Sequence, residues 1–260
     1  MLISDIAKEL ETWAPPAVAE SYDNVGLLVG NPNAEVTGIM VNLDMTEAVI
    51  EEAAAKGCNM VVAHHPIWFT GRKRLIGEDY VSRTIMKAIK LDVSLYAIHT
   101  NLDNVRSGVN RVISDKLGLQ YLSFLKAKDD EGQIGSGMIG MLPDALTKEE
   151  FLTLVKDEFK CGGIRYADAP KDEIRKVAVC GGAGSFLIDE AIRRGADAFV
   201  TADITYHKYF DNEDKLLLLD IGHYESEQYT SPLVVSYLSQ KFPNFAVLQS
   251  ETVTNPVKYF

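Results

Sequence analysis

The sequence predicts an α/β protein with two interlinked lobes built on related βαβ units, in which mixed sheets are flanked by helices. Short apolar runs alternate with segments whose apolar residues recur at helical spacing, which is the pattern of parallel strands covered by helices. Residues 39–65 also align without a gap with residues 177–203, so one βαβ pattern occurs twice. A length of 260 residues is enough for one large or two small domains of this class.

The first part of the chain is expected to alternate helices and strands. A helix over residues 3–13 ends before Pro15 and Pro16, because proline lacks the amide hydrogen that a helix interior needs. A helix over residues 46–56 stops at Gly57, since glycine readily adopts the left-handed conformation that ends a helix. The remaining elements expected here are strands near 26–29, 38–44, 59–63 and 93–99 and a helix near 80–90.

The second part begins where the composition changes between Lys126 and Gly137, first to charged residues and then to glycine and serine. Thr147 and Glu150 have the spacing of a capping box, which opens a helix. Pro232 is expected to kink or restart a helix over residues 224–240. The strands expected here are 176–180, 215–220 and 245–249, the last of which closes a sheet.

The internal repeat is supported by six identities in 27 aligned positions. The alignment places strand over strand, helix over helix and Gly57 over Gly195, which indicates two related βαβ units. It also places Asp203 where the first unit has His65. The identical pairs are Val41/Val179, Ile50/Ile188, Glu52/Glu190, Ala53/Ala191, Gly57/Gly195 and Val62/Val200.

The overall charge and the cysteines exclude several classes of protein. Lys and Arg number 26 and Asp and Glu 37, which gives a formal net charge of −11 and disfavours binding to nucleic acid or to an anionic membrane. The three cysteines form no CxxC pair, which favours reduced thiols in a cytoplasmic protein. The N-terminus is amphipathic and no apolar run approaches membrane-spanning length, so neither secretion nor membrane insertion is expected.

Ligands typical of divalent metals follow several predicted strands. His64 and His65 end the apolar run 60–63, Asp103 follows the strand near 93–99, and His223 and Glu227 follow the strand over 215–220. Imidazole and carboxylate suit Zn, Fe, Mn, Co and Ni, and ligands of α/β sheets lie at the carboxyl ends of strands. Five ligands exceed one tetrahedral site and suit two ions that share a carboxylate.

These ligands define the expected lobes. His223 and Glu227 are four residues apart and would stack on one face of a helix, so both can reach one centre. The ligand count suggests that the C-terminal part packs on the first lobe. We therefore expect a metal-binding lobe of residues 1–125 plus 222–260 and a second lobe of residues 126–221.

Five motifs resemble the GTP cyclohydrolase 1 type 2 family, also called the NGG-one-interacting-factor-three-like family, over nearly the whole chain. One departure is Ala202, where many members have glycine, and it leaves Asp203 in place. The motifs are Asp-Asn-Val-Gly-Leu at 23–27, His-His-Pro at 64–66, His-Thr-Asn-Leu-Asp at 99–103, Thr-Ala-Asp-Ile-Thr-Tyr-His at 201–207 and Gly-His-Tyr-Glu-Ser-Glu at 222–227.

The resemblance implies a two-lobed α/β fold with a di-metal centre whose bridging ligand is Glu227. It also implies a homo-oligomer, a toroidal hexamer with sites facing an internal cavity, and a small-molecule substrate such as a nucleotide. Longer members carry an inserted domain between the lobes, for which this chain has no room. The family's metal ligands correspond here to His64, His65, Asp103, His223 and Glu227.

Several further residues have more than one interpretation. His99, Asp203 and His207 are candidate catalytic residues, but both histidines could equally support a ligand, pack or lie on the surface. Asp23 belongs to a turn or holds a ligand histidine through its second ring nitrogen.

Two loops also have more than one interpretation. The loop Gly181–Gly184 favours a tight turn over a phosphate loop, because it lacks both GxGxxG and a Walker lysine. The cluster Arg72, Lys73 and Arg74, which follows Trp68 and Phe69, is either a solvated loop or a lid for an anionic or stacking substrate.

Two classes of function follow. The first is a metal-dependent hydrolase that resembles GTP cyclohydrolase 1 type 2 and acts on a purine nucleotide or phosphoester with two divalent ions. The alternative is a non-catalytic metal-binding or interaction protein with a structural di-metal site.

Overall fold

The computed structural model describes all 260 residues and divides into two compact units. One unit comprises residues 1–102 and 230–255, and the other comprises residues 103–229 and 256–260. Residues 222–229 and 256–260, expected in the first lobe, lie in the second unit, and so does the segment 103–125. The reason is its packing, because α5 (Val109–Lys116) contacts β8 (Glu173–Ala183) and β5 (Gln120–Ala127) pairs with β6 (Gly135–Thr147).

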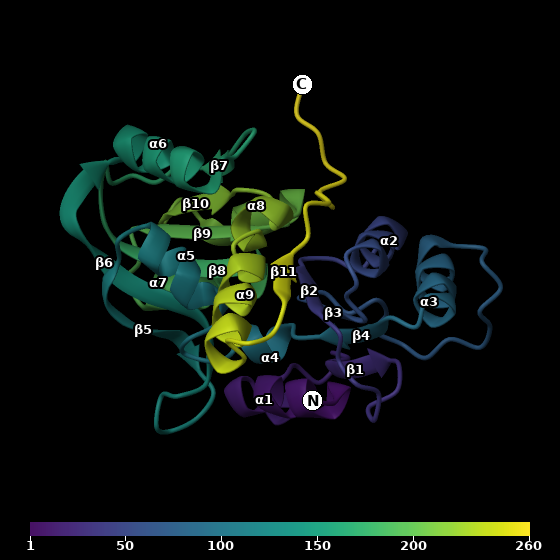
Figure 1. Ribbon diagram of the computed structural model, residues 1–260. Helices are drawn as coiled ribbons and strands as arrows, with labels where there is room; N and C mark the ends of the chain where they lie inside the picture. The colour runs from purple at the N-terminus through teal and green to yellow at the C-terminus, as the bar shows by residue number, and fades with distance from the viewer. The chain divides into compact units, whose positions relative to one another are not determined.

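The first unit contains a five-stranded mixed sheet (Figure 1). Its order is β1-β4-β3-β2-β11, and β1 is antiparallel to β4 while the other pairs are parallel. The strands are β1 (Gly26–Val29), β2 (Ile39–Asn42), β3 (Met60–Ala63), β4 (Ser94–Ala97) and β11 (Val247–Gln249). The three central strands are buried at every position, as expected for parallel strands covered on both faces.

Helices α2 (Glu47–Ala55) and α3 (Tyr80–Lys90) pack on each other and on this sheet. Their apolar side chains and those of β2, β3 and β4 form one buried cluster. The carboxylate of Asp79 and the hydroxyl of Ser82 form a capping box that begins α3 at the predicted residue. Helix α1 (Ile3–Trp13) contacts β1, and the ring of Trp13 stacks on Tyr237 at 4.0 Å.

The second unit contains a six-stranded mixed sheet of order β5-β6-β8-β9-β10-β7. The pairs β8-β9 and β9-β10 are parallel and the other three are antiparallel. The strands not yet given are β7 (Arg165–Ala167), β9 (Ala198–Ala202) and β10 (Leu217–Asp220). The helices are α5, α6 (Lys148–Phe159), α7 (Ile188–Arg193) and α8 (His223–Glu227). The capping box predicted from Thr147 and Glu150 is confirmed at the start of α6.

Short elements connect these parts. The 3₁₀ helices are η1 (Pro16–Val18), η2 (Ser185–Leu187) and η3 (Tyr206–Asn212), and α4 (Thr100–Asp103) is a single helical turn. All helices in the structure are too short or too polar to traverse a bilayer.

The two sheets confirm the internal repeat and with it the predicted fold class. In the first unit Ile39 pairs with Met60, and in the second Val177 pairs with Ala198, so each partner is displaced by the same 138 positions. Gly57 and Gly195 both have positive φ, 75° and 67°, after the helix of each unit. The unit β2-α2-β3 thus corresponds residue by residue to β8, η2 with α7, and β9.

The helix expected over 224–240 is two helices, α8 and α9 (Thr230–Lys241). The chain passes from the second unit to the first between Tyr229 and Thr230. Pro232 lies in the first turn of α9, where an amide hydrogen has no partner within the helix and its loss costs little. Proline therefore allows the restart that the sequence indicated.

Candidate metal centre

Two neighbouring parallel strands of the first unit deliver three histidines. His64 and His65 follow β3, and their amides continue the ladder by donating to the carbonyls of Asn42 and Leu43. His99 follows β4, which pairs with β3. The three histidines thus lie at the carboxyl ends of buried strands, where ligand-binding side chains are expected in an α/β sheet.

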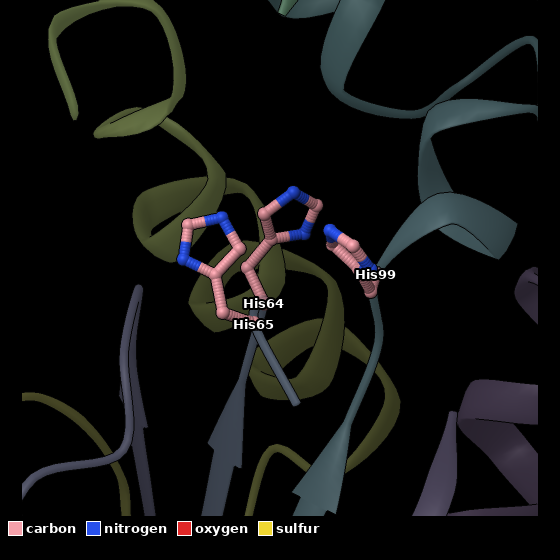
Figure 2. Close-up of side chains that lie close together, drawn as sticks. All are labelled: His64, His65 and His99. Atoms are coloured by element: carbon pink, nitrogen blue, oxygen red, sulfur yellow. The ribbon is translucent and has the colours of Figure 1, made fainter. Parts of the chain in front are cut away.

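The three imidazoles converge on one point (Figure 2). The ring centroids of His64 and His65 are 5.0 Å apart, and the ring of His99 lies 5.1 and 5.4 Å from them. One nitrogen of each ring lies within 4.8 Å of the other two, a spacing that one metal ion can span. The chain bends at His64 and His65, directly after β3, and this brings both side chains to the same place, although successive residues of a strand face opposite sides.

Oxygen atoms fix the orientation of His64 and His65. The Nδ1 atom of His64 lies 2.8 Å from the carbonyl oxygen of Ile98, and Nδ1 of His65 lies 2.7 Å from Oδ1 of Asp44. Because these oxygens accept, each Nδ1 carries the proton and donates. The lone pair of each neutral ring is then on Nε2, as in metal sites whose histidines are oriented by a second residue.

His99 is held by Asp23, as one interpretation of the sequence proposed. Nδ1 of His99 lies 2.9 Å from Oδ1 of Asp23, and the amide and hydroxyl of Thr100 donate to Oδ2. Burial alone would raise the pKa of the Asp23 carboxyl, but the hydrogen bonds from His99, Thr100 and Asn24 lower it to about 2. Asp23 is therefore an anionic acceptor at neutral pH.

The second unit holds His223 between two carboxylates. Nδ1 of His223 lies 2.7 Å from Oδ2 of Asp203, and Nε2 lies 3.0 Å from Oε2 of the buried Glu227. Burial would lower the pKa of His223, but the hydrogen bonds and negative charges of Asp203 and Glu227 raise it to about 11. The two carboxylates therefore favour the imidazolium form of His223, with a proton on each ring nitrogen.

A glycine provides the space for Glu227. Gly182 has a φ of +61°, and a methyl group at its Cα would lie only 2.4 Å from Oε1 of Glu227. A side chain at position 182 would therefore displace the carboxylate, in addition to straining a left-handed backbone.

The loop Gly181–Gly184 uses its amides within the protein. The amides of Gly181, Gly182 and Gly184 donate to Asn110 Oδ1, Ser226 Oγ and Thr201 Oγ1. Residues 181–183 are the end of β8 and its register shifts there, so the structure has an irregular strand where the sequence favoured a tight turn. These amides donate to side chains of the protein, so they give no support to a phosphate-binding loop. Asn110 Nδ2 also donates to the backbone carbonyl of Asp103, so Asn110 connects Asp103 to the loop beside Glu227.

A buried aspartate holds the two turns that carry Asp203 and His223. Asp220 Oδ2 accepts from the amide of Ile204 at 2.9 Å, and Oδ1 accepts from the amide of Gly222 at 3.2 Å. Arg165 pairs with the same carboxylate. Asp203 itself has a φ of +54°, a conformation that side chains rarely adopt, and the bond to Ile204 stabilises this turn.

Most of the predicted site residues fall into two groups, while Asp103, the last residue of α4, belongs to neither. In the first unit His64 and His65 lie together with His99, and in the second unit His223 contacts both Glu227 and Asp203. His207 lies exposed in η3, where its ring faces those of Tyr206 and Phe210 at 5.3 and 6.3 Å. Arg72 is paired with Asp79 at 2.6 Å.

Two carboxylates that hold candidate site residues or their turns were missed by the sequence analysis, Asp44 and Asp220. Asp44 follows the buried strand β2 of the first unit, and Asp220 is the last residue of the buried strand β10 of the second unit. That position was the available signal, because the carboxyl ends of neighbouring strands meet at one edge of a sheet.

Comparison with known proteins identifies the class as α/β proteins of the Duf34/NIF3 (NGG1p interacting factor 3) family, whose model matches residues 1–256. The chain belongs to this family, which confirms the resemblance seen in its motifs. It is 34% identical to the GTP cyclohydrolase 1 type 2 homolog of Clostridium acetobutylicum over 99% of this chain and 98% of that protein. The homolog from Lactococcus lactis is 32% identical over 98% of each.

Solved structures agree with this assignment. A hypothetical protein from Staphylococcus aureus superimposes with a TM-score of 0.93 at 30% identity, covering 100% of this chain and 99% of that chain. A Bacillus cereus protein related to NIF3 has a TM-score of 0.94 at 24% identity over 100% and 99% of the chains, which supports the fold alone.

Some relatives are longer. The alignment with a Staphylococcus epidermidis homolog extends over 366 positions, so that relative contains inserted segments that this 260-residue chain lacks.

Proposed function

We propose that this protein binds two divalent metal ions through His64, His65, Asp103, His223 and Glu227 and uses them to hydrolyse a small molecule, a purine nucleotide or a phosphoester. One observation carries this proposal. The Nδ1 atoms of His64, His65, His99 and His223 each face an oxygen acceptor, so that Nε2 is the nitrogen that would bind a metal, at His223 in place of the proton directed at Glu227. Packing alone gives no reason for the same arrangement in four histidines.

The donor set fits divalent transition metals. Neutral imidazole nitrogens and carboxylate oxygens are the ligands that Zn and its neighbours accept, and no ligand here is a thiolate. The carboxylate of Glu227 is buried and close to His223, and a buried carboxylate shared by two cations offsets their mutual repulsion. We therefore propose Glu227 as the bridging ligand.

The remaining residues support this set in the proposed reaction. Asp44, Asp203 and the carbonyl of Ile98 keep the ligand rings in one tautomer and orientation. His99, oriented by Asp23, is placed beside His64 and His65 to bind substrate or to accept a proton from water at Nε2. Two bound cations would lower the pKa of water and polarise a phosphoryl, carbonyl or imine oxygen of the substrate.

Metal analysis of purified protein, prepared without chelator and reconstituted with Zn, Mn or Fe, tests the stoichiometry. We expect close to two ions per chain. Glu227→Gln should weaken both ions, His223→Ala chiefly one, and His207→Ala, which changes an exposed histidine, should keep both. A stoichiometry that never exceeds one would contradict a dinuclear site. Light scattering on the same samples tests the hexamer that the family resemblance implies.

Turnover distinguishes the hydrolase from the non-catalytic alternative. A panel of nucleotides and phosphoesters is assayed with metal-loaded protein, with chelated protein, and after metal is restored. Hydrolysis that disappears on chelation and returns with metal supports catalysis by the metals. Two tightly held ions without turnover of any substrate in the panel would favour the structural role.

A further inference from the structure

Two exposed aromatic rings stand beside the histidine group in the first unit. The ring of Phe69 lies 5.8 Å from that of His99, and the ring of Tyr22 lies 6.3 Å from Phe69. Phe69 is 50% exposed and Tyr22 is 64% exposed, although aromatic side chains of this size usually bury most of their surface.

Hydrogen bonds fix the two segments that carry these rings. Asp23, adjacent to Tyr22, accepts from His99, and Asn24 Nδ2 donates to the carbonyl of Trp68 at 2.9 Å. Trp68 immediately precedes Phe69. The same short network therefore positions both aromatic residues relative to His99, so their placement belongs to the architecture of the site.

We propose that Phe69, assisted by Tyr22, is a stacking platform for a planar heteroaromatic ring of the ligand, while the polar part of the ligand reaches the histidines. This inference rests on the proposed function and deepens it, because it names the ligand class and the residues that select it. Exposed π-faces stack on any planar ring with little dependence on its substituents, whereas the imidazoles would interact with polar or anionic groups.

Charge is consistent with a ligand that combines a ring and an anionic group. Lys73 and Arg74 are exposed and follow Phe69 in the same loop, within a chain whose net charge is −11. Local cations in a protein of opposite overall charge favour an anionic group near this loop. A nucleoside monophosphate has both required parts.

Calorimetric titration tests the platform with three probes that carry a ring, the 5′-monophosphates of guanosine, adenosine and uridine. Ribose 5-phosphate, which has the phosphate without the ring, is the comparison ligand. We expect at least one nucleotide to bind zinc-reconstituted protein about tenfold more tightly than ribose 5-phosphate. Phe69→Ala should remove most of this difference and Phe69→Tyr should keep it, since base stacking on an aromatic side chain is worth about tenfold in affinity.

Phe186→Ala is the matched control, because Phe186 is 60% exposed but lies in η2 of the second unit. It should leave nucleotide binding unchanged. Equal affinity for ribose 5-phosphate and all three nucleotides, or no effect of Phe69→Ala, overturns the inference.

Metal content, measured on the same variants, separates this inference from the proposed function. Phe69→Ala should keep the wild-type metal content. If it loses metal as His64→Ala does, the rings serve only to shield the Asp23–His99 pair, and the platform is refuted. Ring-dependent binding by protein that never holds metal would support the platform and refute the metal-binding function. Two bound metals without ring-dependent nucleotide binding would support the metal-binding function and refute the platform.

Discussion

Gly182 shows how one residue determines whether the carboxylate of Glu227 can occupy its place. We predict that Gly182→Ala lowers the affinity for the ion that depends on Glu227 by about tenfold or more, because a methyl group would lie 2.4 Å from Oε1 of Glu227. Metal content after dialysis against a weak chelator measures the change.

The control for Gly182→Ala is Gly195→Ala. Gly195 has nearly the same backbone, with φ of +67° against +61°, but a methyl group there would have no heavy atom within 4 Å. Both variants should lose about 1 kcal/mol of unfolding free energy from the left-handed backbone. An equal metal content in the two variants would contradict the role of the close contact with Glu227.

Asp23 gives a prediction for stability at acid pH. Its pKa is lowered from 3.8 to about 2, so its contribution to the unfolding free energy is present above pH 3.8 and is lost as pH falls through 2. The ionised Asp23 contributes about 2 kcal/mol to the unfolding free energy in total, and about 1 kcal/mol of this contribution should be lost between pH 5 and pH 3.

Urea unfolding of metal-free protein at pH 5 and pH 3, compared with Asp23→Asn, measures this contribution. Asp23→Asn should be less stable at pH 5 and should lose less on acidification, since Asn does not titrate. Parallel losses in the two proteins would show that the hydrogen bonds to His99 and Thr100 do not favour the ionised carboxylate.

At the scale of elements, Glu52 on α2 holds the segment that follows β11. Its carboxylate accepts from Ser250 Oγ, the amide of Glu251, and the amide and hydroxyl of Thr252, and it pairs with Lys56. Thr254, two residues beyond, donates to the Asp44 carboxylate that orients His65. This short segment therefore connects α2 with the edge of the sheet that carries His64 and His65.

We predict that Glu52→Ala costs about 2 kcal/mol of stability, because it leaves several donors of the C-terminal segment without their charged acceptor. Hydrogen exchange at residues 250–252 should accelerate strongly. Glu51→Ala is the control, since Glu51 is the neighbouring, more exposed carboxylate and pairs with Lys87. Unchanged exchange in Glu52→Ala would show that β11 alone fixes this segment.

Elements were predictable from sequence because their signals are local. The capping residue of α3, the glycine that ends α2 and the apolar run of β3 each lie within the element that they define. The histidines could be singled out as candidate ligands, since they follow strands closely. Their acceptors were harder to predict, because Asp23 and Asp44 reach His99 and His65 from 76 and 21 residues away through strand register. The contact of Asp23 with a histidine was one of two interpretations of its motif, and Asp44 was missed.

The boundaries of the two units could not be predicted from the sequence for a related reason. Residues 103–125 follow the strands of the first unit without a break in composition, yet α5 and β5 pack on the second sheet. Long-range packing determined the boundary, whereas the sequence analysis had only the glycine-rich turn near Gly137 as a local signal.

For the whole molecule, proton release should accompany metal binding. Asp203 and Glu227 raise the pKa of His223 to about 11 in the metal-free protein, far above the ordinary 6.5 of imidazole. A metal that binds Nε2 must displace this proton at any pH below 11, so affinity should fall as pH decreases, about tenfold per unit from this residue. Without metal, the contribution of the His223 imidazolium to stability is complete below pH 6.5 and is lost as pH rises through 11.

Titration of zinc into metal-free protein at pH 7.5, in buffers of different ionisation enthalpy, measures the protons released. We expect the wild-type protein to release about one proton more than His223→Ala when zinc binds. Equal release by the two proteins would show that His223 is already neutral before the metal binds.

The path of the chain has a consequence for synthesis on the ribosome. The second unit has all six strands once residue 220 has been made, whereas the first still lacks α9 and β11, which come from residues 230–249. Until then β2, the neighbour of β11, is an open edge, and open strand edges promote association with other chains. The unit that is translated first is therefore completed last. A chain that terminates near residue 229 would have all six strands of the second sheet but an exposed strand edge in the first sheet.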